Sequence, residues 1–528
     1  MKMHILITGK LHPMALRLFK DASDVEVSYH PDLSAVEILP LMAKAHAIVS
    51  RSETDVTREM IDRAPKLKVI ARAAVGVGNI DVEYATEKGI LVINAPGKNT
   101  NSAAELTFGL LLAAVRKIIP AHEHLHNCRW DRHRFSGTEL MGKTIGIIGL
   151  GNVGHRVATF ARAFDMKVLS YDPYIADEVF ESNGVRKVSL EALIAESDIV
   201  TIHTPKTRET FNMIAAPQIA AMKAGVILIN AARGGLYNEQ DLLAALDSGH
   251  VRAAGIDTWT VEPPQNNPFR LLPQVVMTPH IGASTEEAQL RIAESIAEQT
   301  LRALRDEVVD FPVNMPQVRA ITSPRVKYYT VLAEKLGAFA VQSLDFNPRL
   351  ITIMYRGELK TEDGGMIRRA FLKGFLNSTV DEVISFVNAE RKAAERGIQV
   401  AEVDDPTFRD YQGAVKFIAS NGTQQFVVGG VVFGENNYRL SLVNEWTFEM
   451  VPSGELLSIL NVDRPGVIGQ VGTLLSDYGI NISQFELSRN MPGGQAMSLI
   501  RVDQPVDGII LEALRSLHNV ITVRRIFI

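Results

Sequence analysis

A glycine motif with the spacing of a pyrophosphate-binding turn lies in the first third of the chain. The segment TIGIIGLGNVG at 144–154 runs from an apolar stretch into Gly149-x-Gly151-x-x-Gly154. Glycines at these positions permit a tight turn and a close approach to a phosphate, and the helix that follows would direct its first N–H groups at that phosphate. The motif therefore predicts a dinucleotide site, with further contacts from Asn152 and Val153 at the start of the helix.

A carboxylate follows at the distance at which such sites hold a ribose. Asp172 lies 18 residues after Gly154, at the end of the apolar run KVLSYD. An aspartate at a strand end accepts hydrogen bonds from ribose hydroxyls and repels the additional phosphate of NADP. A glycine-rich turn beside a surface aspartate is the alternative interpretation, but the preceding apolar run and the following helical pattern favour a site for NAD.

Three polar side chains farther along the chain each follow an apolar run. Arg233 lies in NAARGG, Glu262 in VEPP and His280 in TPHIGAST. Oxidation of a 2-hydroxy acid needs a base for the hydroxyl proton, a carboxylate for the imidazolium that forms, and a planar cation for the substrate carboxylate. Each residue alone also has an ordinary structural interpretation. In this order, behind the dinucleotide motif, they are candidates for these three roles.

Alternating short apolar runs and helical patterns predict the elements that position these residues. HILITG, VEVSYH, AHAIVS, LKVIARA and ILVINAP predict one parallel sheet, and a second follows the helix expected at 102–118. A further helix at 284–307 would run back to the first sheet. The sequence thus predicts an α/β fold with two doubly wound parallel sheets: a discontinuous substrate domain, 1–95 and 282–310, and a coenzyme domain, 96–281.

The texture of the sequence changes after Asp310. Pro312, Pro316 and Pro324 indicate a linker. Strand patterns such as RLITIMYRG, QFVVGGVVFG and YRLSLVN then accompany helix patterns at 323–346 and 379–396, which predicts an α+β domain at 311–451. A second break at 452–454 opens a unit at 452–528 that reads strand, helix, strand, strand, helix, strand.

Composition excludes several other classes of protein. The 528 residues are 46% hydrophobic and 22% charged with a net charge of −5, which is typical of an ordinary soluble protein and not of a nucleic-acid binder. The single cysteine, Cys128, rules out an intramolecular disulfide and a cysteine metal cage. Neither a signal peptide nor a membrane-spanning run is expected, so we expect a cytoplasmic protein without a metal.

The motifs GLGNVG followed by Asp172, NAARGG, VEPP and TPHIGAST resemble, in this order, the D-isomer-specific 2-hydroxyacid dehydrogenases. The resemblance covers residues 1–310. It implies a Rossmann coenzyme domain, substrate carboxylate binding by Arg233, and an acid/base pair of Glu262 and His280. It also implies NAD contacts from residues of the later strand ends, namely Thr204, Pro205, Ala231, Asp257, His280 and Gly282.

Resemblance extends to the rest of the chain. LNVDRPGVIGQVGTLLSDYGINI at 460–482 is similar to ACT domains, which have a ferredoxin-like fold and sense amino acids, and RRAFLKGFL with FVNAERKAAERGI resembles the intervening domain of long-form D-3-phosphoglycerate dehydrogenases. Such enzymes oxidise 3-phospho-D-glycerate to 3-phosphooxypyruvate at the entry to serine synthesis. The resemblance further implies a homotetramer and L-serine as an effector, with Asn461, Asp463 and Asn481 at the serine-binding positions.

The resemblance also names substrate contacts. Arg51 and Ser52, which follow AHAIVS, offer a cation and a hydroxyl to a distal phosphate, and the other matching positions are Val75, Gly76, Asn99, Arg233 and His280. Trp130 resembles the tetramer contact of the family, although a core tryptophan is an equally ordinary interpretation.

Some residues depart from the family pattern. Ala74 and Gly78 replace a glycine and an aspartate in RAAVGVGNID, Tyr237 and Asn238 replace a valine–aspartate pair, and Asn461 is unusual at its position. Two alternatives therefore stay open: a dehydrogenase or reductase for another 2-hydroxy or 2-oxo acid, and an NAD-sensing corepressor. The ACT unit and the lack of a basic or helix-turn-helix segment weigh against the corepressor.

Overall fold

The computed structural model describes residues 2–307, 309–315, 324–361, 364–377, 384–406, 411–434 and 436–528. Within these ranges the strands form four sheets. The chain divides into two compact units, one made of Met1–Lys10, Leu16–Asn94 and Ile296–Ile528 and the other of Leu11–Ala15 and Ala95–Ser295. Pro316 of the expected linker lies outside the described residues.

The first sheet has five parallel strands in the order β2-β1-β3-β4-β5. The strands are β1 Met3–Thr8, β2 Val25–His30, β3 Ala47–Ser50, β4 Val69–Arg72 and β5 Leu91–Ile93, and the helices are α1 Pro13–Asp21, α2 Ala35–Ile38, α3 Arg58–Asp62 and α4 Val82–Glu87, with a 3-10 helix η1 at Leu39–Lys44. All five strands match the apolar runs of the sequence. Because parallel strands end at one edge, the residues after β3 and β4 lie together there.

The second sheet has seven parallel strands in the order β12-β11-β10-β9-β6-β7-β8. The strands are β6 Thr144–Ile148, β7 Lys167–Tyr171, β8 Arg186–Lys187, β9 Ile199–Ile202, β10 Val226–Asn230, β11 Val251–Ile256 and β12 Val275–Met277. The helices are α5 Thr100–Val115, α6 Ile118–His126, α7 Asn152–Ala163, α8 Asp177–Ser182, α9 Leu190–Glu196, α10 Ala216–Ala220, α11 Glu239–Asp247 and α12 Glu286–Leu304, with 3-10 helices η2 Arg132–Phe135 and η3 Pro268–Leu271. The compact-unit boundary at Ser295 falls within α12.

Both faces of this second sheet are covered by helices, which explains why its strands read as nearly continuous apolar runs. Ile145 and Ile147 of β6 pack into a core with α5 and α7, whereas Ile148 packs into a second core with α9, α10 and α11. This alternation follows the two-residue period of a strand. The expected helices at 102–118 and 284–307 are confirmed as α5 and α12.

The third sheet has six strands in the order β14-β13-β15-β16-β17-β18, parallel between β13 and β14 and antiparallel elsewhere. The strands are β13 Leu350–Gly357, β14 Gln399–Asp405, β15 Gly413–Ser420, β16 Gln425–Phe433, β17 Asn437–Val443 and β18 Trp446–Met450, and the helices are α13 Pro324–Ser343, α14 Gly364–Asn377 and α15 Ala389–Glu395. Helices α13 and α14 meet almost backbone to backbone, since a Cβ on Gly374 would lie 1.9 Å from the carbonyl oxygen of Glu334.

One sequence prediction for this domain is wrong. The helix expected at 379–396 begins only at Ala389, and 384–388 form a turn; residues 379–383 of the prediction lie outside the described residues. The side-chain oxygen of Asn388 accepts a hydrogen bond from the N–H of Ser385 at 2.8 Å. Such a local bond offers the backbone an alternative to the helix, which delays the helix start.

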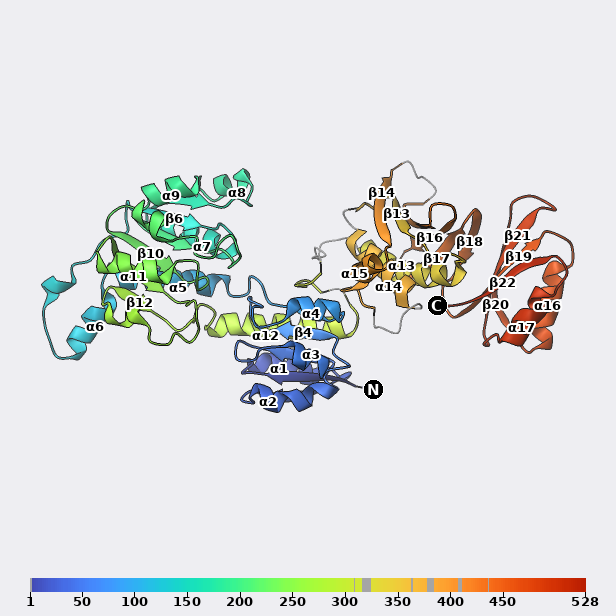
Figure 1. Cartoon of the computed structure of the whole chain (residues 1–528), viewed down its shortest axis with the longest axis horizontal. Coiled ribbons are helices and arrows are strands. Elements are labelled where there is room, and N and C mark those ends of the chain that lie inside the picture. Colours follow the sequence, from blue (N-terminus) through green and yellow to red (C-terminus); the bar gives the residue numbers. More distant parts are fainter. Residues whose placement is uncertain are drawn as a thin grey trace. The chain divides into compact units, whose positions relative to one another are not determined.

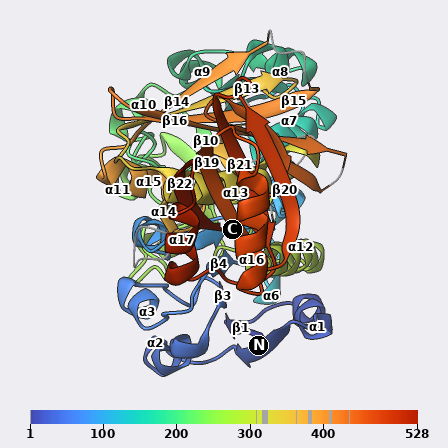
Figure 2. The ribbon, with the colours of Figure 1, turned by 90° about the vertical axis from the view of Figure 1, so that its right-hand side faces the viewer.

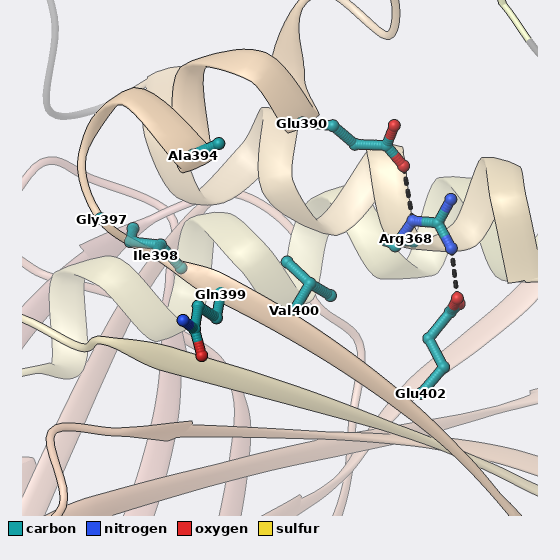
Figure 3. A pocket seen from close by; sticks show the side chains of 8 residues that line it. All are labelled: Arg368, Glu390, Ala394, Gly397, Ile398, Gln399, Val400 and Glu402. Carbon is teal, nitrogen blue, oxygen red and sulfur yellow. Dashed lines mark hydrogen bonds and ion pairs between the residues drawn. The ribbon is translucent and has the colours of Figure 1, made fainter.

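A pocket of about 700 Å³ lies between α14, α15 and β14 of the same domain (Figure 3). Arg368 lies between Glu390 and Glu402 and forms an ion pair with each, and Arg369 pairs with Glu390 as well. Glu402 also accepts a hydrogen bond from the hydroxyl of Tyr355 at 2.6 Å. Because each of these charges has an opposite partner, the network ties the two helices to the edge of the sheet.

The fourth sheet is antiparallel, in the order β20-β21-β19-β22. Its elements are β19 Glu455–Val462, α16 Val467–Asp477, β20 Ile482–Arg489, β21 Gln495–Val502, α17 Gly508–Arg515 and β22 Val520–Phe527. Both helices cover one face of the sheet (Figure 1 and Figure 2). The predicted alternation of strands and helices is therefore confirmed.

Among the described residues, no helix is both long and apolar enough to cross a bilayer. In the same part of the chain, no group of three or more His, Cys, Asp or Glu side chains is arranged to hold a metal ion.

Candidate active site

The glycine motif forms the turn between β6 and α7, and each glycine has a separate reason to be there. Gly149 has a φ of +91°, a conformation that favours glycine. A Cβ on Gly154 would lie 2.0 Å from the carbonyl oxygen of Gly149, so this position holds the helix against the strand. A Cβ on Gly151 would meet nothing within 4 Å, which leaves that face open to a ligand. Helix α7 begins at Asn152 without a side-chain cap.

Asp172 follows β7 and is oriented by the backbone. One carboxylate oxygen accepts a hydrogen bond from the N–H of Leu150 at 2.9 Å, and the other accepts from the N–H of Tyr174 at 3.0 Å. The carboxylate is thus fixed beside the glycine turn. Lone pairs remain on both oxygens for ribose hydroxyls.

Two observations show that these residues fit NAD. The hydroxyl of Thr204, which together with Pro205 follows β9, is buried and has no hydrogen-bond partner among the described residues. A buried hydroxyl without a partner is costly, so a ligand group here would satisfy it. The second observation is the open face of Gly151 next to the uncapped start of α7, which suits a pyrophosphate.

His280 and Glu262 form a direct hydrogen bond. Nδ1 of His280 lies 2.8 Å from Oε2 of Glu262, and Oε1 of Glu262 accepts from the N–H of Trp259 at 3.0 Å. Burial alone would raise the pKa of Glu262, but the hydrogen bonds from His280 and Trp259 and the charges of His280 and Arg233 bring it below the usual glutamate range. The carboxylate is therefore ionised near neutral pH and accepts from Nδ1, which leaves Nε2 of His280 as the proton acceptor.

The loop that carries His280 is organised by Asp257, at the end of β11. The Asp257 carboxylate is fully buried and accepts hydrogen bonds from the hydroxyl of Thr278 at 2.6 Å and from the N–H groups of Ile281 and Gly282 at 2.8 and 3.0 Å. Its carbonyl oxygen accepts from the N–H of His280 at 2.8 Å. These bonds hold His280 in a left-handed conformation, φ +55°. A Cβ on Gly282 would lie 3.9 Å from the carbonyl oxygen of Ala231, so these two expected NAD contacts are neighbours.

Arg233 lies beside this pair. A Cβ on Gly234 would lie 1.8 Å from the carbonyl oxygen of Trp259, so only glycine lets the arginine loop pack against the loop of Glu262. Burial lowers the pKa of Arg233, and the charge of Glu262 opposes that shift. Arg233 stays protonated because an arginine does not lose its charge in proteins. The three candidate catalytic residues therefore converge within one compact unit.

A second group of predicted residues meets at the edge of the first sheet. Arg72, at the end of β4, donates from Nη2 to the hydroxyl of Ser52 at 3.2 Å and from Nε to the carbonyl oxygen of Gly76 at 3.0 Å. Arg51 donates to the carbonyl oxygen of Lys10 at 2.8 Å. The carbonyl oxygen of Val75 accepts from Asn94 at 2.6 Å. Arg51, Ser52, Val75 and Gly76 are thus brought together, with Arg72 as the residue that links them.

Asn99 belongs to the other compact unit, where it precedes helix α5 without capping it. Arg72 was missed in the sequence because it lies inside an apolar strand, where a charged residue is rare unless paired. The signal was available: it is the only charged residue of the run LKVIARA to end the strand itself. The two departures at Tyr237 and Asn238 are structural, since the buried Tyr237 hydroxyl donates to the carbonyl oxygen of Ile229 at 3.1 Å and Asn238 caps α11.

The three predicted effector residues lie in the last domain in different environments. Asn461 is buried and donates to the carbonyl oxygen of Val462 at 2.9 Å. Asp463 accepts from Arg489, and exposed Asn481 donates to Asp503 at 2.6 Å. Near them, Gly466 precedes α16 with a φ of +95°, and a Cβ on Gly466 or Gly469 would meet nothing within 4 Å. The backbone at this helix start is open to a ligand.

Comparisons with known proteins agree with this geometry. Residues 108–282 match the NAD-binding domain of the D-isomer specific 2-hydroxyacid dehydrogenases, 325–444 match the D-3-phosphoglycerate dehydrogenase intervening domain, and 456–519 match the ACT domain. Similar solved structures cover the first part of the chain. A protein of Thermus thermophilus, TT0316, covers 59% of this chain and all of its own at 35% identity and a TM-score of 0.55. D-lactate dehydrogenase of Aquifex aeolicus, solved with NAD and lactic acid, covers 57% of this chain and 96% of its own at 29% identity and a TM-score of 0.51.

Curated relatives span nearly the whole chain. D-3-phosphoglycerate dehydrogenase of Methanocaldococcus jannaschii is 42% identical over 98% of both chains. The enzymes of the same name from Archaeoglobus fulgidus and Bacillus subtilis are 39% identical over 98% of this chain and 99% of theirs, and 36% identical over 91% of both. With an NAD-binding domain, an intervening domain and an ACT domain in this order, the chain belongs to the D-3-phosphoglycerate dehydrogenase family.

Proposed function

We propose that the protein catalyses the NAD-dependent oxidation of 3-phospho-D-glycerate to 3-phosphooxypyruvate, the first step of L-serine synthesis. The observation that carries this proposal is the hydrogen bond between His280 and Glu262 beside the loop of Arg233, in a domain that binds NAD. The names of the full-length relatives supply the substrate.

The chemistry follows from the site. NAD, when bound, accepts the hydride that leaves C2 of the substrate. His280 takes the proton of the C2 hydroxyl at Nε2, and the ionised Glu262 stabilises the imidazolium that forms. Arg233 holds the substrate carboxylate through two parallel N–H bonds, which fixes the carbon to be oxidised.

The distal phosphate is assigned to the edge of the first sheet. Arg51 supplies charge and Ser52 a hydroxyl, and Arg72 positions both the Ser52 hydroxyl and the loop of Val75 and Gly76. Asn99 is proposed as a further substrate contact. Contacts to NAD are proposed for the glycine turn, Asp172 and the later strand ends.

Steady-state kinetics test the substrate. The protein should turn over 3-phospho-D-glycerate with a kcat/KM at least tenfold above that for D-lactate or D-glycerate, with NAD preferred to NADP. An Arg51→Gln variant should lose most of the preference for the phosphorylated substrate and keep its turnover of D-glycerate. Equal kcat/KM values for the phosphorylated and unphosphorylated acids would contradict the proposal.

L-Serine is the proposed effector of the last domain. Support comes from the ACT match, the open backbone around Gly466 and the exposed amide of Asn481. Calorimetry should detect serine binding, weakened in an Asn481→Ala variant. A titration with no heat at millimolar serine would refute this assignment.

A homotetramer is the proposed assembly. In α6 and the segment after it, large apolar side chains are exposed, among them Trp130 at 83% and Leu125 at 59%. Such a cluster is typical of an interface. Light scattering should therefore give a mass of about four chains for the wild type and a smaller mass for Trp130→Ala; an unchanged mass would remove Trp130 from the interface.

Four domains are proposed: 1–95 with 282–310 for substrate, 96–281 for NAD, 311–451 intervening and 452–528 regulatory. The division between the compact units at Asn94 and the matched ranges of the three family models support these boundaries.

A further inference from the structure

A hydrogen bond joins two loops at the carboxyl edge of the coenzyme sheet. The hydroxyl of Tyr174, in the loop after β7, donates to Oε2 of Glu209, in the loop after β9, at 2.8 Å. The Tyr174 side chain is otherwise open to solvent, with 80% of the residue exposed. A pair of this kind contributes little to the core, so its position calls for another explanation.

The sheet order shows where this bond lies. Strand β6, which leads into the glycine turn, pairs with β9 on one side and with β7 on the other. The loops after β7 and β9 are therefore the two walls of the crevice above β6. One wall carries Asp172 and the other carries Thr204, and the bond from Tyr174 to Glu209 connects the same two walls.

Both partners are held firmly by their own loops. The N–H of Tyr174 donates to Asp172, the residue assigned to the ribose, at 3.0 Å. The loop of Glu209 is folded on itself, because the hydroxyl of Thr210 donates to the carbonyl oxygen of Pro205 at 2.6 Å and also accepts from the N–H of Thr207 at 2.8 Å. Two stiff loops joined by a bond lose less entropy than two mobile ones.

We propose that Tyr174 and Glu209 form a clasp across the adenosine half of the coenzyme crevice. They are positioning residues: the hydrogen bond sets the distance between the two walls for the adenosine, and the charge of Glu209 adds to that of Asp172 in excluding the 2′-phosphate of NADP. This inference rests on the proposed role of the crevice in NAD binding. The raised pKa of Tyr174, caused first by its hydrogen bond to Glu209, agrees with a carboxylate that stays ionised beside it.

Three variants separate the bond from the charge. Tyr174→Phe removes the donor and keeps the ring, Glu209→Ala removes the acceptor, and Glu209→Gln keeps an acceptor without the charge. Dissociation constants for NAD, NADP and ADP-ribose, measured by calorimetry on the full-length protein without substrate, report binding independently of turnover. ADP-ribose is included because it contains the adenosine half and lacks the nicotinamide.

The clasp predicts a distinct pattern. Tyr174→Phe and Glu209→Ala should weaken NAD and ADP-ribose by the same factor, about 3- to 10-fold, as expected for one hydrogen bond to a charged group. Glu209→Gln should bind NAD within about twofold of the wild type but bind NADP about 3- to 10-fold better relative to NAD. Tyr29→Phe, another exposed tyrosine, and Asp247→Asn, at the opposite edge of the coenzyme sheet, are matched controls that should change nothing.

NAD and ADP-ribose constants within twofold of the wild type in both Tyr174→Phe and Glu209→Ala would overturn the clasp. An unchanged NADP-to-NAD ratio in Glu209→Gln would overturn the role of the charge. Failure of the proposed reaction looks different: the wild type would bind ADP-ribose, and the clasp variants would weaken it, while 3-phospho-D-glycerate gave no turnover.

Discussion

Replacing Glu262 with glutamine separates the charge of this residue from its shape. The wild-type carboxylate accepts from Nδ1 of His280 at 2.8 Å and faces the imidazolium as it forms. Two unit charges about 4 Å apart interact by about 4 kcal/mol at an effective dielectric constant of ~20. The side chains of His280 and Glu262 are 42% and 39% exposed, so solvent screening reduces this to about 2 kcal/mol.

A loss of about 2 kcal/mol in the transition state corresponds to a kcat about 30-fold lower. A glutamine that turns its amide nitrogen toward Nδ1 favours the wrong tautomer of His280, which increases the loss. Since the carboxylate favours the protonated imidazole, its removal should also move the acid limb of the kcat/KM profile to lower pH, by about one unit. The assay is the pH profile of 3-phospho-D-glycerate oxidation at saturating NAD.

A matched control is Glu239→Gln. The Glu239 carboxylate accepts from the N–H of Thr260, in the same loop as Glu262, at 2.7 Å. Glutamine keeps an acceptor there, so kcat should stay within about threefold of the wild type. A Glu262→Gln enzyme with wild-type kcat and an unmoved acid limb would refute the argument that the carboxylate serves the imidazolium.

Three further predictions follow from other contacts. Gly234→Ala should lower kcat/KM at least tenfold without loss of NAD binding, because its Cβ would displace the carbonyl oxygen of Trp259 and with it the loop of Glu262; kinetics close to wild type would contradict this. Asp172→Asn should reduce the ratio of NADP to NAD dissociation constants about tenfold, since an ionised acceptor beside the ribose is lost, and calorimetry with both nucleotides checks it. Burial lowers the pKa of His203 to about 4, against 6.5 when unfolded, so the native state holds it neutral. Its stability contribution is complete above pH 6.5 and falls by about 3 kcal/mol as the pH drops from 6.5 to 4, and urea unfolding of His203→Asn should show a flatter dependence in this window.

Much of the architecture follows from the pattern of apolar residues. The strands of both parallel sheets coincide with apolar runs because buried strands need hydrophobic residues on both faces. Arg233, Glu262 and His280 were identified as candidates because each follows such a run, and parallel strands bring these ends to one edge. The ACT domain was readable for a similar reason, since its strands and helices alternate with clear turns.

Other features depend on contacts between distant segments. Helix α14 was not predicted, because Gly364, Gly365 and Gly374 weaken its local helix propensity. The structure explains Gly374 by the close approach of α13, and no local signal carries this information. In the same way, Asp257 reads as an ordinary strand end, and only the fold shows that its carboxylate holds the loop of His280.

The central claim is that Nε2 of His280 removes the substrate proton. The most direct measurement is the kcat of His280→Ala with 3-phospho-D-glycerate, together with its dissociation constant for NAD. The account predicts a kcat lower by about two to four orders of magnitude, the usual worth of a positioned acid/base, with NAD binding changed by less than about fivefold. A variant that binds NAD and turns over at close to the wild-type rate would contradict it.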